Sequence, residues 1–251
     1  MPPPISRTKP AFRLESPETG TTYSIYVALP EPELIGPRIA VLLMDGDYFF
    51  DPAVAAAQEL SAHGQIAPAL IVGVGYGAGF GAKNNRRGRD YTPVASSLEP
   101  GSGGAEPFLR FLAATLWPEL ARRYPVREDA RGIGGHSLGS LLVLHALFQS
   151  TPFFNLALAS APSIWWEDRA ILASIAQRRA AQASLNGTLY LGVGADDTAS
   201  MTGDLKLLEE QLAAHPFEGL RVVTERYTGR DHYDVAPDTL RGGLQALLGV
   251  K

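Results

Sequence analysis

The chain has 251 residues, of which 45% are hydrophobic and 19% charged, and it contains no cysteine. A chain of this size and composition can bury a large core, so we expect a single domain over residues 1–251. The missing cysteines exclude disulfides and cysteine-ligated metals. The net charge of −4 disfavours nucleic-acid and anionic-membrane partners, because both bind clustered positive charge.

The N-terminal residues 1–10 are rich in proline and polar groups, and we expect them to be flexible. They contain no apolar segment of the signal-peptide kind, which predicts a cytoplasmic protein. The most apolar stretch, residues 138–148, is interrupted by His145 and is too short to span a bilayer. We therefore expect no membrane association.

Two short alternating segments, 12–14 and 22–29, flank the polar turn 18–20 and predict a hairpin. Beyond them, apolar strand-like segments alternate with helical ones. The predicted strands are 39–44, 69–74, 131–136, 156–159, 189–193 and 221–227. The predicted helices are 52–63, 105–124, 138–148, 168–181, 205–215 and 236–248, with Pro118 kinking or dividing the second. This order predicts an α/β fold with a mostly parallel eight-stranded sheet and helices on both faces.

Two segments interrupt the alternation. Residues 77–104 form a long, glycine-rich stretch without a clear period, and loops of this length are usually functional or mobile. Residues 162–186 are few and hold one predicted helix, so any lid that they form over an active site is small.

A candidate nucleophile lies in the motif Gly135-His136-Ser137-Leu138-Gly139, a G-x-S-x-G match between a predicted strand and a predicted helix. A serine on such a tight turn exposes its hydroxyl, and flanking glycines remove β-carbons that would clash there. The helix N-terminus offers N–H groups and its positive dipole end to an oxyanion. The alternative is an ordinary strand-to-helix turn with a serine cap.

His232 is the best candidate for the base that a serine nucleophile requires. It lies in the loop 229–232 after the last predicted strand, and such loops gather at one edge of a parallel sheet. The other histidines have simpler structural interpretations as helix-end, core or nucleophile-flanking residues; they are His63, His136, His145 and His215.

The acid that orients such a histidine is expected after the strand 189–193, where Asp196 and Asp197 are adjacent. In α/β-hydrolases the order along the chain is serine, acid, histidine, and both aspartates satisfy it. We favour Asp197 and assign Asp196 to turn hydrogen bonds, although the reverse assignment remains open.

Several segments resemble the putative-esterase family of the α/β-hydrolase superfamily, which includes esterase D-like enzymes and siderophore trilactone esterases. They are LLMDGDYFF (42–50), IVGVGY (71–76), NNRRGRDYTP (84–93), GGAEPFLRFL (103–112), GGHSLGSLL (134–142) and SAPSIWW (160–166). The last three together are most similar to the siderophore esterases. The resemblance implies an α/β-hydrolase fold and hydrolytic chemistry across nearly the whole chain, and says much less about the substrate.

The resemblance also implies an oxyanion hole formed by the backbone N–H groups of Leu138 and Asp47, the latter after the Asp45-Gly46 turn. In this family the acid is the variable member of the triad. The alternative interpretation of residues 45–47 is a plain Asp-Gly turn.

Substrate contacts are predicted from two clusters. Arg86 and Arg89, with Arg87 between them, lie in the long loop and suit an acidic or catecholate-like ligand, although salt bridges are the alternative. Trp165 and Trp166 follow a predicted strand at the same edge; at least one should be packed, and one is a candidate pocket residue.

The sequence thus predicts a serine carboxylic-ester hydrolase that forms an acyl-enzyme and acts on a small-molecule ester, including siderophore-like esters. The alternatives are an acyltransferase with the same triad or a non-catalytic hydrolase-like binding protein. No dinucleotide, nucleoside-triphosphate or metal-binding pattern is present in the sequence, so we expect no cofactor and no metal. No pattern indicates an oligomeric state.

Overall fold

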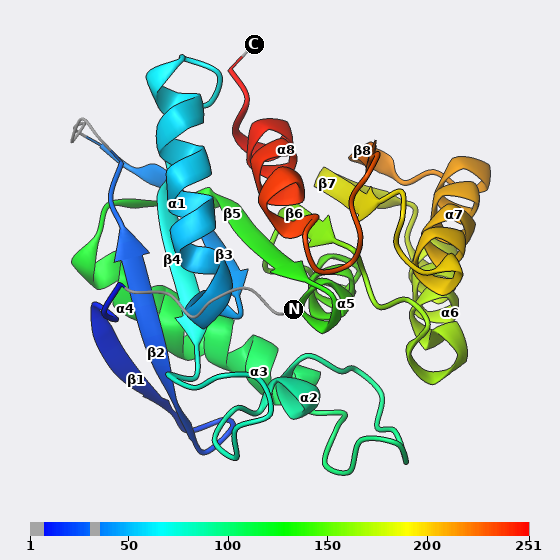
Figure 1. Ribbon diagram of the computed structural model, residues 1–251, viewed down its shortest axis with the longest axis horizontal. Helices are drawn as coiled ribbons and strands as arrows, with labels where there is room; N and C mark the ends of the chain where they lie inside the picture. The colour runs from blue at the N-terminus through cyan, green and yellow to red at the C-terminus, as the bar shows by residue number, and fades with distance from the viewer. Residues whose placement is uncertain (1–7, 31–35, 251) are drawn as a thin grey trace.

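A computed structural model of the chain describes residues 8–30 and 36–250 (Figure 1). Most of the predicted flexible segment 1–10 therefore lies outside the described residues. Within them, one eight-stranded sheet runs in the order β1-β2-β4-β3-β5-β6-β7-β8. The strands are β1 (Phe12–Ser16), β2 (Thr21–Ala28), β3 (Arg38–Met44), β4 (Leu70–Gly75), β5 (Val126–His136), β6 (Leu156–Ser160), β7 (Ser184–Gly194) and β8 (Glu218–Tyr227).

The sheet is mostly parallel. β1 and β2 form an antiparallel hairpin, β2 is antiparallel to β4, and the remaining neighbours are parallel. The predicted eight-stranded α/β architecture is confirmed. Because β3 to β8 run the same way, their carboxyl ends share one edge of the sheet.

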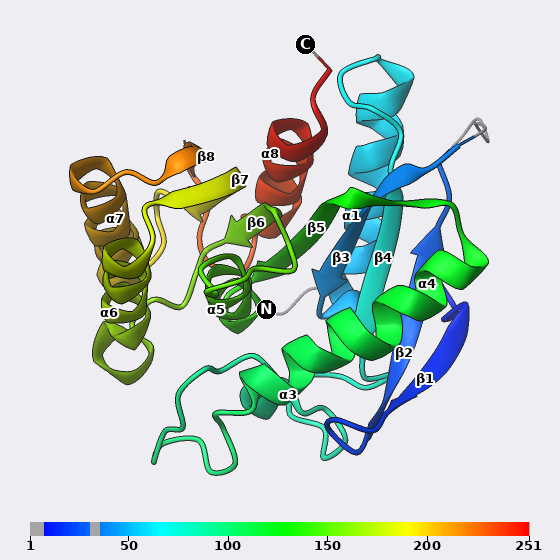
Figure 2. The same cartoon turned by 180° about the vertical axis from the view of Figure 1, so that it is seen from behind.

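Helices cover both faces. They are α1 (Gly46–Ala62), α2 (Arg87–Asp90), α3 (Ala105–Arg110), the π-helical η1 (Phe111–Leu116), α4 (Trp117–Arg123), α5 (Leu138–Leu147), α6 (Trp166–Ala181), α7 (Ala199–Ala214) and α8 (Ala236–Leu248). One face carries α1 and α8, and the opposite face carries the long α3–η1–α4 rod together with α5 (Figures 1 and 2). Each face has its own apolar core, so the sheet is buried on both sides.

Two predicted helices begin several residues later than those observed, and the second of them, 205–215, starts at Ala199 as α7. The first begins at Gly46, not at residue 52, and Pro52 lies inside it. Gly46 allows this early start, because a β-carbon there would lie 2.6 Å from the carbonyl carbon of Gly73 in β4. The segment 105–124 is divided as expected: a π-helical stretch ends just before Pro118, which has no N–H to continue the helical ladder.

Candidate active site

Ser137 occupies a tight turn between β5 and α5. Its φ of 60° and ψ of −120° are unusual for a residue with a side chain and carry a conformational cost. The turn is held on both sides: Ser137 N donates to Ser160 O of β6 at 2.9 Å, and Ser140 N donates to Ser137 O at 3.0 Å. The side chain is consequently presented at the carboxyl edge of the sheet.

The two glycines of the motif are required by close packing within this turn. A β-carbon on Gly135 would lie 2.5 Å from the carbonyl carbon of Gly139, a distance that backbone atoms cannot tolerate. A β-carbon on Gly139 would lie 3.3 Å from Cβ of Met44 in β3. The G-x-S-x-G pattern therefore follows from the space between β5 and the first turn of α5.

We expect Gly135→Ala to lower the free energy of unfolding by about 1–3 kcal/mol, the usual range for overpacking. Gly203→Ala is the matched control, because Gly203 is in α7 and no atom lies within 4 Å of its β-carbon position. The control should be neutral or stabilised by a few tenths to about 1 kcal/mol. Urea unfolding curves measure both effects, and equal stabilities of the two variants would contradict the packing argument.

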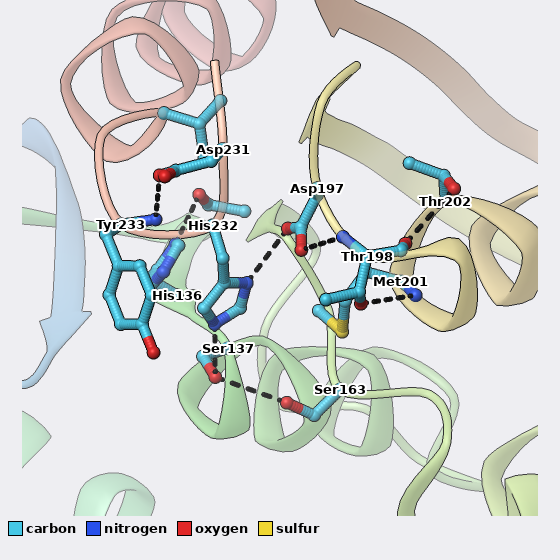
Figure 3. Close-up of polar contacts among 12 residues, drawn as sticks. His136, Ser137, Ser163, Asp197, Thr198, Met201, Thr202, Asp231, His232 and Tyr233 are labelled. Carbon is cyan, nitrogen blue, oxygen red and sulfur yellow. Dashed lines mark hydrogen bonds and ion pairs between the residues drawn. The ribbon is translucent and has the colours of Figure 1, made fainter.

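The side chains of Ser137, His232 and Asp197 form one hydrogen-bonded chain (Figure 3). His232 Nε2 lies 3.1 Å from Ser137 Oγ, and His232 Nδ1 lies 2.9 Å from Asp197 Oδ2. The Asp197 carboxylate is fully buried, whereas the imidazole keeps a 23% exposed side chain. The three residues come from the loops after β5, β7 and β8, so the topology brings together residues 95 positions apart.

Asp196, the other candidate acid, points elsewhere. Its side chain is exposed, and its N–H donates to Arg230 O at 3.0 Å across the two loops. Asp197 also accepts from Thr198 N at 2.6 Å through its second oxygen, which fixes the carboxylate orientation. The geometry thus joins Asp197, and not Asp196, to His232.

Asp231 organises the loop that carries His232. Its Oδ1 accepts from Tyr233 N at 2.8 Å and from Asp234 N at 3.1 Å. These backbone donors, Tyr233 N first, hold the pKa of Asp231 below its ordinary value. An aspartate that accepts from N–H groups two and three residues ahead is typical of turns, and this signal was available in the sequence.

His136 lies directly beneath the candidate base. Its ring is 4.8 Å from the ring of His232, its Nδ1 lies 2.9 Å from Ser160 Oγ, and it hydrogen-bonds the backbone of His232. Ser160 Oγ in turn lies 2.6 Å from Thr239 Oγ1 of α8. Burial, together with the nearby positive charges, lowers the pKa of His136 to about 3. His136 is therefore a neutral structural contact between β5, β6 and the His232 loop.

The lowered pKa of His136 predicts a loss of stability in acid. Between about pH 6.5 and pH 3 the unfolded chain binds a proton at this residue and the folded protein does not. Its contribution to stability is thus complete above pH 6.5 and declines as the pH falls. Between pH 7.5 and 4.5 we expect wild-type protein to lose about 2–3 kcal/mol more of unfolding free energy than His136→Gln. Urea unfolding at the two pH values measures these losses. Equal losses of unfolding free energy in wild-type protein and in His136→Gln would contradict the prediction.

The two residues predicted to form an oxyanion hole both lie at helix N-termini. Leu138 is the first residue of α5 and Asp47 the second of α1, positions at which a helix leaves its N–H groups unpaired. The Asp47 side chain is buried and accepts from Tyr26 Oη at 2.6 Å and from Tyr76 N at 2.6 Å. Asp47 therefore lies in the first turn of a helix and is rigidly held.

A cavity of about 260 Å³ opens beside Ser137 and His232. Its other walls are His136, the aromatic rings of Phe49, Phe80 and Tyr233, and the guanidinium of Arg87. Phe80 stacks on Tyr48 with ring centroids 3.9 Å apart, which anchors the long loop against α1. We refer to this space as the serine cavity.

Arg87 is fixed on the wall of the serine cavity by Asp45. Its Nη2 lies 2.9 Å from Asp45 Oδ2 and its Nε lies 3.1 Å from Oδ1. Burial raises the pKa of Asp45 although Arg87 acts in the opposite direction. The Arg87 guanidinium also lies 4.8 Å from the ring centroid of Phe80. The wall thus combines an ion pair with aromatic surface.

The predicted substrate residues do not line this cavity. Arg89 is committed to structure, with its Nε 2.7 Å from Asp90 Oδ1 and its Nη2 2.8 Å from Thr21 Oγ1 of β2. Arg86 lines a different cavity. Trp166 is buried and its Nε1 donates to Val94 O at 2.8 Å, which confirms that one tryptophan is packed, whereas Trp165 is 43% exposed.

The sequence analysis placed Arg87 in the arginine cluster but did not identify three other residues of the serine cavity: Phe49, Phe80 and Tyr233. Two signals were present. A lone phenylalanine within the glycine-rich stretch needs burial, and Tyr233 adjoins the candidate base. Ser163 also lies at the site, because its Oγ is 3.3 Å from that of Ser137. No pattern in the sequence around Ser163 indicated this position.

Residues 8–30 and 36–250 lack two features that are typical of other classes of protein. No helix there is both long and apolar enough for a membrane span. In the same ranges, no three or more histidine, aspartate or glutamate residues are grouped as a metal site would require.

The chain is similar to several known proteins. The family described as "Putative esterase" matches residues 16–232. A siderophore triacetylfusarinine C esterase of Aspergillus fumigatus is 36% identical over 171 residues, covering 64% of this chain and 58% of the relative. The ferri-bacillibactin esterase BesA of Bacillus subtilis is 28% identical over 255 residues, covering 94% of this chain and 88% of the relative.

Two solved structures share the architecture over nearly the whole chain. The BES protein of Bacillus cereus superposes with a TM-score of 0.87 at 27% identity and covers 98% of this chain and 97% of that chain. The siderophore hydrolase EstB of Aspergillus nidulans has a TM-score of 0.82 at 25% identity, with 99% and 98% covered. With a family match over residues 16–232 and this fold, the chain belongs to the Putative esterase family and has the α/β-hydrolase fold.

Proposed function

We propose that the protein is a carboxylic-ester hydrolase in which Ser137, His232 and Asp197 act as a catalytic triad. The observation that supports this most strongly is the chain of two hydrogen bonds from Asp197 through His232 to Ser137. In the first half-reaction Ser137 Oγ bonds to the ester carbonyl carbon while its proton passes to His232 Nε2. The carbonyl electron pair moves to oxygen, where the N–H groups of Leu138 and Asp47 stabilise the charge.

Collapse of this intermediate re-forms the carbonyl and breaks the bond to the alcohol. The leaving oxygen takes the proton from His232, and an acyl-Ser137 ester remains. In the second half-reaction water gives a proton to His232 and its oxygen bonds to the acyl carbon. Ser137 then leaves and recovers its proton, and the free acid is released. Asp197 holds the imidazole in one tautomer and stabilises its cation in both halves.

For the substrate, we propose an ester of the siderophore kind. Four of the similar proteins are named as esterases of triacetylfusarinine C, ferri-bacillibactin, enterobactin and apo-salmochelin. The serine cavity suits a planar, electron-rich or anionic acyl group, because it combines aromatic rings with the guanidinium of Arg87.

The decisive experiment is a panel of esters with product analysis. It should compare short p-nitrophenyl esters, feruloyl and acetyl sugars, and catecholate and hydroxamate siderophore esters. A fluorophosphonate probe that labels Ser137 establishes the activated nucleophile separately from substrate choice. Absence of both labelling and hydrolysis would refute the proposed esterase activity. Labelling of Ser137 together with hydrolysis of simple esters only would refute the siderophore proposal and leave the esterase activity standing.

The rate of hydrolysis should fall as the solution is acidified, because His232 must be neutral to accept the serine proton. His136 does not contribute to this acid limb, since its pKa of about 3 keeps it neutral throughout. We expect a single ionisation in kcat/KM for an uncharged ester. Initial rates between pH 4 and 9 measure it, and a profile that stays flat down to pH 4 would contradict a histidine base.

A further inference from the structure

A second cavity, of about 370 Å³, opens at the same edge of the sheet as the serine cavity. Its walls include Arg13 of β1, Thr22 and Ser24 of β2, and Gly77, Asn84 and Arg86 of the long loop. The strand register explains its position. Arg13 pairs with Ser24, and Ser24 pairs with Gly75, the last residue of β4. The cavity is therefore level with the strand ends that carry the candidate catalytic loops.

The long loop forms a wall of both cavities. Gly77, Asn84 and Arg86 face the second cavity, whereas Phe80 and Arg87 face the serine cavity. In the strand order, β2 and β5 are separated by β4 and β3. With neighbouring strands about 4.8 Å apart, the two cavities lie on the order of 10–15 Å from each other. This separation is within the length of a single extended ligand.

The second cavity carries positive charge without a matching acid. Among the residues that the structure describes, neither Arg13 nor Arg86 forms an ion pair, although the neighbouring Arg87 and Arg89 both do. No aspartate or glutamate lines the cavity. The nearest acid on β1 is Glu15, two residues beyond Arg13 on the same face.

The nearby carboxylate of Asp47 is already engaged in hydrogen bonds. The Asp47 carboxylate, below Gly77, is buried and accepts the Gly77 N–H at 3.0 Å. The second cavity therefore has two guanidinium groups and no carboxylate among its lining residues. The remaining walls supply further donors, namely the hydroxyls of Thr22 and Ser24 and the amide of Asn84.

We propose that this second cavity is an anion subsite, which binds a negatively charged group on a remote arm of the same ester whose carbonyl lies at Ser137. The inference rests on the proposed esterase function. Guanidinium groups bind carboxylates and comparable oxyanions through paired hydrogen bonds, and both Arg13 of β1 and Arg86 of the long loop line the cavity. The ligand is thus an ester with an anionic group on the order of 10–15 Å from the scissile bond.

The test compares two series of p-nitrophenyl esters of equal chain length, one ending in a methyl group and one in a carboxylate. Wild-type protein should prefer the carboxylate series once its spacer is long enough to reach the subsite. Arg13→Gln and Arg86→Gln should each lower kcat/KM for that ester about tenfold or more, mainly through KM. Both should leave the methyl-terminated ester unchanged. Salt should reduce the preference, because the arginines are exposed.

Lys83→Gln is the matched control, since Lys83 is an exposed cation of the same loop outside the cavity wall. It should change neither series. Equal effects of all three substitutions, or no effect of Arg13→Gln and Arg86→Gln, would overturn the subsite.

Binding to the Ser137→Ala variant separates the subsite from catalysis. Calorimetry with the carboxylate-terminated ester and with inorganic phosphate needs no turnover. The ester should bind to Ser137→Ala more tightly than phosphate does, and this difference should disappear in the double variant Ser137→Ala/Arg86→Gln. This result would support a subsite for a substrate arm even if wild-type protein hydrolyses neither series. Equal affinity for phosphate and ester would instead indicate a free-anion site and overturn the proposal.

Discussion

Ser137→Ala should lower kcat for ester hydrolysis by on the order of a million-fold, because no other group can form the acyl-enzyme. The substitution removes one oxygen and leaves the turn hydrogen bonds through Ser137 N and O in place. His232→Ala should cost about as much, and the double variant little more, because the two side chains act as one unit. Steady-state kinetics with a p-nitrophenyl ester measure all three.

Ser163→Ala is the control for this prediction. Its Oγ lies 3.3 Å from Ser137 Oγ, so it removes a hydroxyl at nearly the same place without touching the hydrogen bond to His232. We expect most of the activity to remain. A Ser137→Ala variant that retains more than a few per cent of the wild-type rate, with contaminating esterases excluded, would disprove the mechanism.

Asp197→Asn should lower kcat by roughly ten-thousand-fold while the protein remains folded. An amide at this position can present N–H to His232 Nδ1, which favours the tautomer that cannot accept a proton from Ser137. The buried amide also cannot neutralise the imidazolium that forms as Ser137 attacks. Kinetics in parallel with circular dichroism separate this effect from unfolding.

Asp196→Asn provides the comparison one residue away. Asp196 is exposed and contacts the His232 loop through its backbone only, so its substitution should cost far less. The reverse ranking would transfer the acid role to Asp196. Near-full activity in both single variants and in the double variant would mean that Ser137 and His232 work as a dyad.

The sequence predicted best where one local pattern determines one structure. The N-terminal hairpin pattern predicted β1 and β2, and the alternation of strand-like and helix-like segments predicted the six strands from β3 to β8. The motif around Ser137 predicted the turn because its glycines are required by contacts within a few residues. The start of β5 was missed for the converse reason: residues 127–129 are charged and exposed although they belong to the strand.

The substrate side was harder to predict because it depends on which way each side chain of an irregular loop points. Three arginines lie within four residues of the long loop, and the structure gives them three different surroundings. Arg86 faces the second cavity, Arg87 faces the serine cavity, and Arg89 is tied to the β1–β2 hairpin. Arg87 and Arg89 belong to the short helix α2 and Arg86 directly precedes it, and the four residues of this helix carry no periodic pattern in the sequence.

The position of β8 has a consequence for how the protein loses activity. β8 is an edge strand that pairs only with β7, and most of its side chains are at least partly exposed. His232 lies in the loop that follows it, so the histidine depends on an edge strand that has no fully buried residue. Opening of an edge strand needs less free energy than global unfolding. Gentle heating should therefore inactivate the protein through local fraying, with faster amide hydrogen exchange in β8 while β3 and β5 stay protected.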